Sequence, residues 1–409
     1  MNTLSTDKLN YDVVIVGAGM AGSLLALSLL TKNASLKILL LDENPERIKP
    51  ESTSNPSFDA RCIALNAGSV DVLNELSLWK DIEKNAQSIL QIQVSDRGYL
   101  GAPELTPETK DNAFGYVVEL RHVGDILVRK LATFESLTTL YNVKLESIEQ
   151  QAASVVCHLS NTQSIAAKLC VGADGGNSQV RNLSNIQSRR SDYHRSAIIC
   201  NLSTSKPHQS IAYERFTKNG PIALLPLTDN RFSLVYCVEN KDLDVIQNLS
   251  DCDFLAHLQA QFGFRAGIFE QTGTRDVYPL SLLTSPHPIS HRVVCIGNAA
   301  HSLHPVAGQG FNLGLRDLSV LAEVITQSDV ENIGSFAMLN NYWQCRKVDH
   351  NKTILMTDSL VRIFSNQYHL LSIPRTLGLQ AMSLFPCLSQ PIIEQAKGQF
   401  NLFNREKLS

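Results

Sequence analysis

A glycine-rich stretch near the start of the chain, VVIVGAGMAG at residues 13–22, constrains the fold more than any other feature. It follows a short, continuous apolar run at 11–16, which predicts a buried strand, and overlaps a longer apolar run at 20–30, which predicts a buried helix. A second buried strand at 37–41 ends at Asp42. These residues predict a βαβ unit, and therefore an α/β fold that begins with a parallel sheet.

The glycines of this stretch have the GxGxxG spacing of a dinucleotide-binding turn. The first glycine allows a tight turn, the second lets a pyrophosphate approach the backbone, and the third lets the helix pack closely on the strand. The free N–H groups of the helix N-terminus attract phosphate, and Asp42, twenty residues after the last glycine, is expected to bind a ribose. The predicted binding residues are Gly17, Gly19, Met20, Ala21, Gly22, Asp42 and Glu43. The motif does not separate NAD from FAD.

Further along the chain, the pattern predicts an amphipathic helix at 70–85, a strand at 90–98, a helix at 123–134 and a strand followed by a turn at 168–175. Between 197 and 238 strands alternate with turn signals, which indicates an antiparallel sheet of a different class. A helix is expected at 253–262. A buried strand at 292–296 then returns the chain to the first fold, and the pattern is mostly helical from about residue 315.

A second glycine-rich stretch, GNAAHSLHPVAGQGFNLGLRD at 297–317, follows that returning strand. It predicts another helix N-terminus, with the helix beginning near Phe311 or Asn312. FAD is longer than the site that one βαβ unit offers, because its ribityl chain and flavin ring must also be anchored. We therefore expect Asn298 to hold the ribityl chain or the pyrophosphate and the turn at 308–312 to face the flavin pyrimidine carbonyls. The predicted residues here are Asn298, Pro305, Gly308, Gln309, Gly310, Phe311 and Asn312.

Two other stretches carry polar residues with two interpretations each. Arg61 stands in an apolar run and needs an anion, which is either a phosphate or flavin edge, or a carboxylate such as Asp59. In GADGGNSQVR, residues 172–181, Asp174 and Gly175 form either a cofactor contact or an ordinary Asp-Gly turn.

A metal site is not expected. His301 and His304 are three residues apart and Cys295 is near, but no helix carries both histidines and no carboxylate partner is apparent. We expect these histidines to bond backbone groups or to lie beside the flavin.

The composition excludes several classes. The net charge of −3 gives no electrostatic basis for nucleic-acid binding. Nine scattered cysteines without a CxxC pair favour a reducing, cytoplasmic setting. The polar N-terminus is not a signal peptide, and no apolar stretch is long enough for a membrane-spanning helix.

Three motifs in order, GAGMAG with Asp42, GADGGNSQVR and the stretch at 297–317, resemble the FAD-dependent aromatic hydroxylases of the p-hydroxybenzoate hydroxylase type. Arg61 and Arg121 fall where that family places flavin-contacting side chains. Over nearly the whole chain, stretches such as FDARCIALNAGS, ERFTKNGPIALLPL and TDSLVRIFSN resemble most closely the ubiquinone-biosynthesis members that act on 2-polyprenyl-6-methoxyphenols. One departure is Asn298, where an aspartate is usual in the wider family.

The resemblance implies a split, Rossmann-like FAD-binding domain with an inserted antiparallel β-sheet substrate domain and a C-terminal helical region. The expected FAD-binding segments are 1–88, 99–182 and 276–325. The substrate domain takes 89–98 and 183–275, and the helical region takes 326–409.

The resemblance also implies the reaction. NAD(P)H binds transiently and reduces FAD, O₂ then gives a C4a-hydroperoxyflavin, and its distal OH is transferred to the ring of a polyprenylated phenol. The flavin carries the chemistry, so no residue is predicted as a catalytic acid or base. Phe216, Leu225 and Pro226 are expected either to line the ring pocket or to pack in the core.

A polyprenyl substrate is insoluble, so peripheral contact with the inner face of the membrane and membership of a quinone-biosynthesis enzyme complex are further interpretations. The apolar stretch 377–403 either docks on that membrane or completes the core.

Alternatives stay open at this point. An FAD-dependent reductase or dehydrogenase of a polyprenyl lipid would share the cofactor fold but incorporate no oxygen. A non-catalytic FAD-binding scaffold would hold FAD that NAD(P)H never reduces. An NAD-linked dehydrogenase is disfavoured by the second glycine-rich stretch and the strand-rich insertion.

Overall fold

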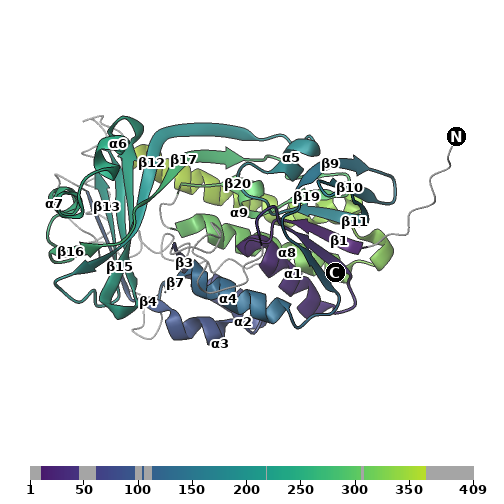
Figure 1. Cartoon of the computed structure of the whole chain (residues 1–409), viewed down its shortest axis with the longest axis horizontal. Coiled ribbons are helices and arrows are strands. Elements are labelled where there is room, and N and C mark those ends of the chain that lie inside the picture. Colours follow the sequence, from purple (N-terminus) through teal and green to yellow (C-terminus); the bar gives the residue numbers. More distant parts are fainter. Residues whose placement is uncertain are drawn as a thin grey trace.

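The computed structural model of the 409-residue chain describes residues 11–45, 61–96, 104–105, 113–217, 219–304 and 308–364. Two halves lie side by side in Figure 1, each built around its own large sheet. The stretch 377–403, Pro305 and Asp59 lie outside the described residues, so the interpretations that rest on them are not taken further.

The first half is built on an eight-stranded sheet with the order β18-β19-β11-β1-β2-β8, to which the hairpin of β9 and β10 is added at β11. Strands β19, β11, β1, β2 and β8 run parallel to one another, and β18 pairs with β19 in the antiparallel sense. The central strands β1 and β2 are apolar runs because helices or a hairpin cover both faces of the sheet. The strands are β1 Tyr11–Val16, β2 Ile38–Leu41, β8 Leu137–Leu140, β9 Leu145–Gln150, β10 Val155–Leu159, β11 Ser164–Gly172, β18 Ile289–Ser290 and β19 Val293–Cys295.

Helices cover one face of this sheet, where a single apolar cluster joins them to alternate residues of β1 and β2. The other face packs against the β9–β10 hairpin and the short helix α5, Gln179–Leu183. The covering helices are α1 Met20–Lys32, α4 Leu120–Leu131, α8 Gln309–Gln327 and α9 Phe336–Phe364. The βαβ unit predicted from the first glycine-rich stretch is therefore confirmed.

The helix predicted at 70–85 is wrong as a single element. Helix α2, Ala67–Glu75, ends before Ser77, which has a positive φ of 55°. A separate turn of helix, α3 at Trp79–Ile82, and a 3₁₀ turn at Glu83–Asn85 follow. The break allows Leu76, Leu78 and Trp79 all to be buried, which one face of a straight helix cannot do.

A small three-stranded sheet with the order β3-β7-β4 lies between the halves. Its strands are β3 Cys62–Asn66, β4 Gln87–Ile89 and β7 Gly115–Glu119.

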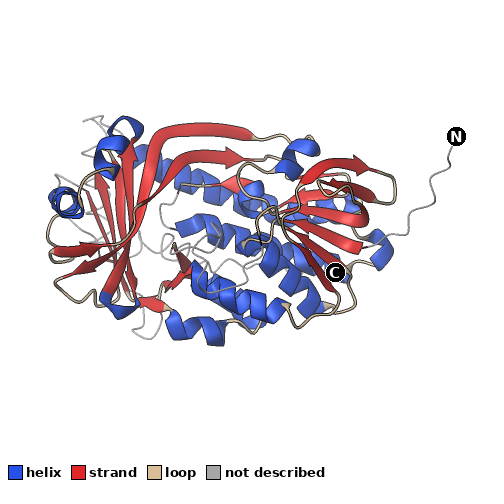
Figure 2. Cartoon of the chain, viewed as in Figure 1, coloured by secondary structure: helices blue, strands red, loops and turns tan. Residues whose placement is uncertain are grey.

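The second half is a nine-stranded sheet with the order β20-β17-β12-β15-β14-β13-β5-β6, with β16 paired to β12. It is antiparallel as predicted, except that β5 runs parallel to β13. Figure 2 shows β12 and β17 as long strands that reach from this half back to the first. The strands are β5 Gln91–Asp96, β6 Glu104–Leu105, β12 Arg189–Thr204, β13 Ile211–Thr217, β14 Gly220–Leu227, β15 Arg231–Glu239, β16 Phe269–Thr272, β17 Asp276–Thr284 and β20 His301–Ser302.

The two faces of this sheet have different neighbours. The outer face carries Tyr213, Leu224 and Tyr236 and packs against α6, Asn240–Gln247, and α7, Asp251–Phe262. The alternate residues form what we call the inner face, which is turned toward the first half: Ala197, Ala212, Glu214, Phe216, Ala223, Leu225, Cys237 and Tyr278. Ala212, for example, packs with Ile89 and Val117 of the small sheet.

The domain division drawn from the sequence stays a prediction. Strands β5, β12, β13, β14 and β15 of the nine-stranded sheet fall within the segments expected for the substrate domain. Strand β17 also belongs to that sheet, although the division begins the last FAD-binding segment at residue 276. Among the described residues, no helix has the length and apolarity to cross a bilayer.

Candidate functional site

The three predicted motifs meet at the carboxyl edge of four adjacent parallel strands, β2, β1, β11 and β19. The Gly17 N–H donates to the carbonyl oxygen of Leu41 at 2.7 Å, and the Ala173 N–H donates to that of Val16 at 2.8 Å. On the next strand, the Ile296 N–H donates to the carbonyl oxygen of Gly172 at 2.9 Å. Segments almost 300 residues apart in sequence therefore end side by side, at the edge where open α/β sheets bind ligands.

The first glycine turn is held in the shape that its motif requires. Gly17 has a φ of 105°, and a Cβ there would lie 2.5 Å from the carbonyl oxygen of Ala173. A Cβ on Gly22 would overlap the carbonyl oxygen of Gly17. Gly19 is the N-cap of α1, and that helix has neither a side-chain cap nor an acid in its first turn. Its first N–H groups are therefore left to an anion.

Asp42 fastens this turn as well as offering a ligand group. Its Oδ2 accepts the Ala18 N–H at 2.7 Å, and its Oδ1 accepts the backbone N–H and the amide Nδ2–H of Asn44 at 2.8 and 2.9 Å. Each carboxylate oxygen can accept about two hydrogen bonds, so Oδ2 retains a lone pair. The neighbouring Glu43 is exposed, and Met20 is buried at the start of α1 beside the partly buried Ala21.

Asp174 has one oxygen committed and one without a partner. Oδ2 accepts the N–H groups of Gln179 and Val180 at 2.7 and 3.1 Å and so holds the start of α5. Oδ1 is buried and accepts no hydrogen bond from the residues that the structure describes. A Cβ on Gly175 or Gly176 would meet nothing within 4 Å. The Asp-Gly turn thus presents an unused acceptor beside open space.

The N-terminus of α8 is the second helix start that the sequence predicted, although the helix begins at Gln309 rather than at Phe311 or Asn312. Its N-cap is Gly308, with a φ of 60°, and it has no side-chain cap and no acid in its first turn. A Cβ on Gly310 would meet no atom of the described residues within 4 Å. Gln309 is buried and Phe311 packs partly against the core, while Asn298 is exposed just after β19.

The side chain of Asn312 has a role that the sequence did not predict. Its Oδ1 accepts from the Asn66 N–H at 3.1 Å and the Ser69 hydroxyl at 2.6 Å. Its Nδ2 donates to the carbonyl oxygens of Ala64 and Gly308 at 2.9 and 2.8 Å. The amide is therefore occupied in joining β3 and α2 to the start of α8, and only the backbone N–H of Asn312 remains for a cofactor.

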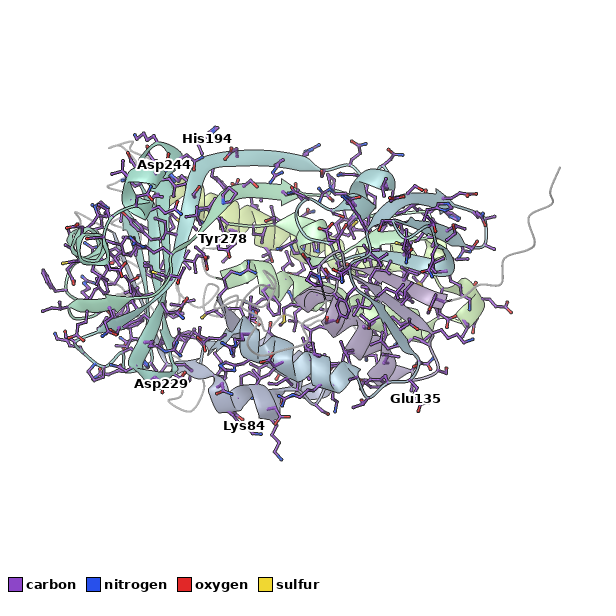
Figure 3. The ribbon with its side chains drawn as sticks, in the orientation of Figure 1. Lys84, Glu135, His194, Asp229, Asp244 and Tyr278 are labelled. Atoms are coloured by element: carbon purple, nitrogen blue, oxygen red, sulfur yellow. The ribbon has the colours of Figure 1, made fainter. Side chains whose placement is uncertain are left out.

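Arg61 and Arg121 lie close together in the backbone because the Leu120 N–H donates to the carbonyl oxygen of Arg61 at 2.9 Å. The Arg61 guanidinium lies 5.0 Å from the ring centroid of Tyr278 on β17, which is labelled in Figure 3. This cation–π contact joins the small sheet to the inner face. Arg121 is exposed in the first turn of α4.

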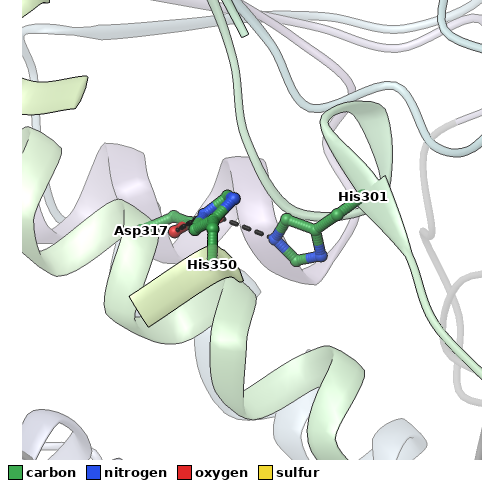
Figure 4. Close-up of side chains that lie close together, drawn as sticks. All are labelled: His301, Asp317 and His350. Carbon is green, nitrogen blue, oxygen red and sulfur yellow. Dashed lines mark hydrogen bonds and ion pairs between the residues drawn. The ribbon is translucent and has the colours of Figure 1, made fainter. Parts of the chain in front are cut away.

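His301 does have a carboxylate partner, so the reason given from sequence against a metal there is wrong. Its Nε2 lies 2.7 Å from Asp317 Oδ2, and the Nε2 of His350 lies 2.7 Å from Asp317 Oδ1 (Figure 4). These three groups could hold a metal ion by their spacing. The guanidinium of Arg346, however, also donates to Asp317 Oδ1 at 2.8 Å and already supplies the positive charge.

This cluster of His301, Asp317, Arg346 and His350 is buried, and burial alone would raise the pKa of the Asp317 carboxyl. The positive groups around it hold that pKa well below its usual range. Burial lowers the pKa of His350, so its imidazole stays neutral and donates through Nε2–H. The sequence offered a signal here, since Asp317 lies on the helix that begins at the second glycine-rich turn.

The ring-pocket candidates fall on different faces of the nine-stranded sheet. Phe216 and Leu225 are on the inner face, whereas Pro226 alternates with Leu225 and so lies on the outer face beside Leu224. Of the two alternatives given for Pro226, its place on the outer face favours packing in the core. Cys237 on the inner face lies 4.0 Å from His304, whose pKa burial lowers to about 4.

These residues fit FAD. The uncapped starts of α1 and α8 suit anionic groups, the unused Asp174 Oδ1 suits a hydroxyl donor, and the open space at Gly175, Gly176 and Gly310 admits a ligand against the backbone.

Comparison with known proteins agrees with this arrangement. The model of a family described as FAD binding domain matches residues 10–348. The ubiquinone hydroxylase UbiL of Rhodospirillum rubrum is 32% identical over 402 residues, which cover 98% of this chain and 92% of that protein. The mitochondrial ubiquinone biosynthesis monooxygenase COQ6 of Homo sapiens is 29% identical, over 95% of this chain and 92% of its own.

The fold also matches solved structures. The p-nitrophenol 4-monooxygenase PnpA of Pseudomonas putida has a TM-score of 0.76 at 18% identity, over 95% of this chain and 99% of that one. At that identity the likeness shows the fold alone.

Proposed function

Because this chain belongs to the FAD binding domain family, we propose that it is an FAD-dependent monooxygenase that hydroxylates the ring of a polyprenylated phenol in ubiquinone biosynthesis. The observation that carries the proposal is the meeting of three motifs at one sheet edge. The second and third motifs contain glycines that border open space, Gly175, Gly176 and Gly310. The relatives named as ubiquinone hydroxylase and ubiquinone biosynthesis monooxygenase support the substrate class, because each aligns with nearly the whole chain.

The residues of the sheet edge would hold FAD along its length. Gly17, Gly19 and Gly22, with the start of α1, would take the pyrophosphate, and Asp42 would take a ribose hydroxyl on its remaining lone pair. Asp174 would accept a hydroxyl of the cofactor on Oδ1. The remaining proposed contacts are the backbone or side-chain groups of Met20, Ala21, Glu43, Arg61, Arg121, Gly175, Asn298, Pro305, Gly308, Gln309, Gly310, Phe311 and Asn312.

The N-terminus of α8 would stabilise negative charge on the ring system of the cofactor through its free N–H groups. FAD, once reduced by NAD(P)H, supplies the oxygen-activating chemistry. In the net reaction one ring C–H becomes C–OH, while O₂, NAD(P)H and a proton give water and NAD(P)⁺. The apolar inner face, with Ala223 and Leu225, would orient the ring and exclude water.

The test uses the purified, FAD-loaded protein and 2-geranyl-6-methoxyphenol, a soluble short-chain analogue. An oxygen electrode and the absorbance of NAD(P)H are followed together. The proposal predicts that the phenol stimulates NAD(P)H oxidation and that about one O₂ is consumed per NAD(P)H and per hydroxylated product. Stimulated NAD(P)H oxidation that persists without oxygen while the added lipid is reduced would indicate the reductase instead. Bound FAD that NAD(P)H never reduces would indicate a scaffold.

We further propose that the protein works in the cytoplasm, in peripheral contact with a membrane surface and with other quinone-biosynthesis enzymes. The support is the chemistry of the proposed substrate, whose prenyl chain partitions into bilayers. Sedimentation with phosphatidylethanolamine–phosphatidylglycerol vesicles tests the membrane part, and a protein left in the supernatant contradicts it.

A further inference from the structure

The inner face carries a half-buried acidic side chain, Glu214. Glu214 lies in the middle of β13, between Tyr213, which packs in the outer cluster, and Arg215. Alternation along the strand puts Glu214 on the same side as Ala212, which packs against the small sheet of the first half. Its carboxyl group is therefore turned toward the half that carries the cofactor edge.

The two same-face neighbours of Glu214 along β13 and the two residues directly opposite it are apolar, and Asp96 follows diagonally on β5. Ala212 and Phe216 flank it along the strand, Ala223 faces it on β14, and Val94 faces it on β5. Within the part of the chain that the structure describes, no residue gives this carboxyl a hydrogen bond or an ion pair, and its Oε1 is shut off from solvent. The residue as a whole is half-buried, so the cost to stability comes from Oε1, which neither water nor a described residue satisfies.

The protonation of this group is also unusual. Burial raises the pKa of Glu214 to about 7. Near neutral pH the group is therefore present both as an acid and as a carboxylate, and each form lacks a partner in the protein. An unpartnered, perturbed carboxyl on the face of a candidate site is the kind of group that a ligand completes.

A short path joins Glu214 to the second glycine-rich stretch. Cys237 on β15 lies close enough for the Glu214 charge to help raise its pKa, although burial is the larger cause. The Cys237 Sγ lies 4.0 Å from the Nε2 of His304, between β20 and the start of α8. The inner face around Glu214 is thus next to the turn proposed to face the flavin.

We propose that Glu214 binds the ring hydroxyl group of the phenolic substrate, accepting its hydrogen bond and fixing the orientation of the ring on the inner face. The proposal rests on the proposed function. The phenol O–H is the donor that the carboxyl lacks, and the half-buried Val94 and Ala223, which face Glu214 on the two adjacent strands, supply apolar contacts for the ring. The group therefore discriminates a free phenol from the same ring with its oxygen capped.

The experiment measures binding of two probes to the FAD-loaded protein by the change in flavin absorbance. The probes are 2-geranyl-6-methoxyphenol and its methyl ether, which differ only in the ring hydroxyl. Wild type is expected to bind the phenol about ten- to one-hundred-fold more tightly than the ether, since a hydrogen bond to a charged group is worth about that factor. Glu214→Leu, which fits the apolar surroundings, should bind both probes equally. Glu214→Gln, which keeps an acceptor without the charge, should retain a smaller preference.

The matched control is Glu270→Gln, an exposed glutamate on β16 of the same sheet, which should keep the wild-type preference. A Glu214→Leu protein that is folded and loaded with FAD but keeps the wild-type preference overturns the proposal, as does a wild type that binds both probes equally. The two hypotheses fail separately. If the protein hydroxylates the phenol but the variants keep the wild-type preference for the phenol over the ether, only the role of Glu214 is wrong. If the preference changes as expected but no oxygen is incorporated, only the proposed reaction is wrong.

Discussion

Replacing Glu214 by glutamine should make the protein more stable than wild type at pH 8, although the change lies on the face proposed to bind substrate. The folded chain holds the carboxyl proton more tightly than the unfolded chain, because burial raises the pKa of Glu214. As the pH rises, the unfolded state loses this proton first. The contribution of the group to stability is therefore fully present below about pH 4.5 and is lost as the pH rises to about 7.

The size of the effect follows from the two pKa values. The ordinary value is 4.5 and the folded value is about 7. At about 1.4 kcal/mol per pH unit, the free energy of unfolding of wild type falls by at most about 3.5 kcal/mol across that interval because of this group. Cys237, whose thiol is within electrostatic reach of Glu214, adds no slope, because burial raises its pKa far above this range. Glutamine does not ionise, so the variant should lack this fall.

The assay is urea unfolding followed by circular dichroism at pH 5 and pH 8, with saturating FAD in every sample. Glu214→Gln should match wild type within about 1 kcal/mol at pH 5 and exceed it by about 2–3 kcal/mol at pH 8. Glu270→Gln should stay within about 0.5 kcal/mol of wild type at both values. A Glu214→Gln variant that is no more stable than wild type at pH 8 would refute the reasoning, because the carboxyl would then have a partner in the folded protein.

Three further changes probe the cofactor edge and its support. Gly22→Ala should lower FAD affinity about ten- to one-hundred-fold, because the new methyl group overlaps the carbonyl oxygen of Gly17, and flavin retained after gel filtration measures it. Asp317→Asn should lower the free energy of unfolding in urea by about 3 kcal/mol, because the buried Arg346 loses one of its two carboxylate partners and keeps only Asp349. Asp244→Asn on the exposed surface of α6 (Figure 3) should change it by less than about 0.5 kcal/mol. Wild type should lose up to about 3 kcal/mol of unfolding free energy as the pH falls from about 6.5 to 4, because the unfolded chain protonates His304 while the folded protein keeps it neutral. His304→Gln should lack this loss. If unfolding free energy depends on pH equally in both proteins, the reasoning is wrong.

The parts of the fold that the sequence predicted are those with strong local patterns. The apolar runs at β1, α1 and β2 are continuous because these elements are covered on both sides. The spacing of the glycines between them is typical of a tight turn that a side chain would block. The break at Ser77 was not predicted, because the apolar residues around it satisfy a helical period until their burial in three dimensions is known.

The site was predicted unevenly for a similar reason. The glycine turns can be predicted from their local spacing. The amide of Asn312, in contrast, accepts a hydrogen bond from the N–H of Asn66, which is 246 residues away, and no local pattern indicates that partner. No prediction was made for Glu214, because a glutamate in a strand carries no local sign of being covered. Only its apolar neighbours on the same face, Ala212 and Phe216, indicate that this face is covered.

The most direct test of the account is the fate of oxygen. The FAD-loaded protein is incubated under ¹⁸O₂ with 2-geranyl-6-methoxyphenol and either NADPH or NADH. The molecular mass of the product is measured by mass spectrometry. The account predicts a ring-hydroxylated product that contains one ¹⁸O atom. A product without the label, or reduced cofactor consumed with the phenol recovered unchanged, would contradict it.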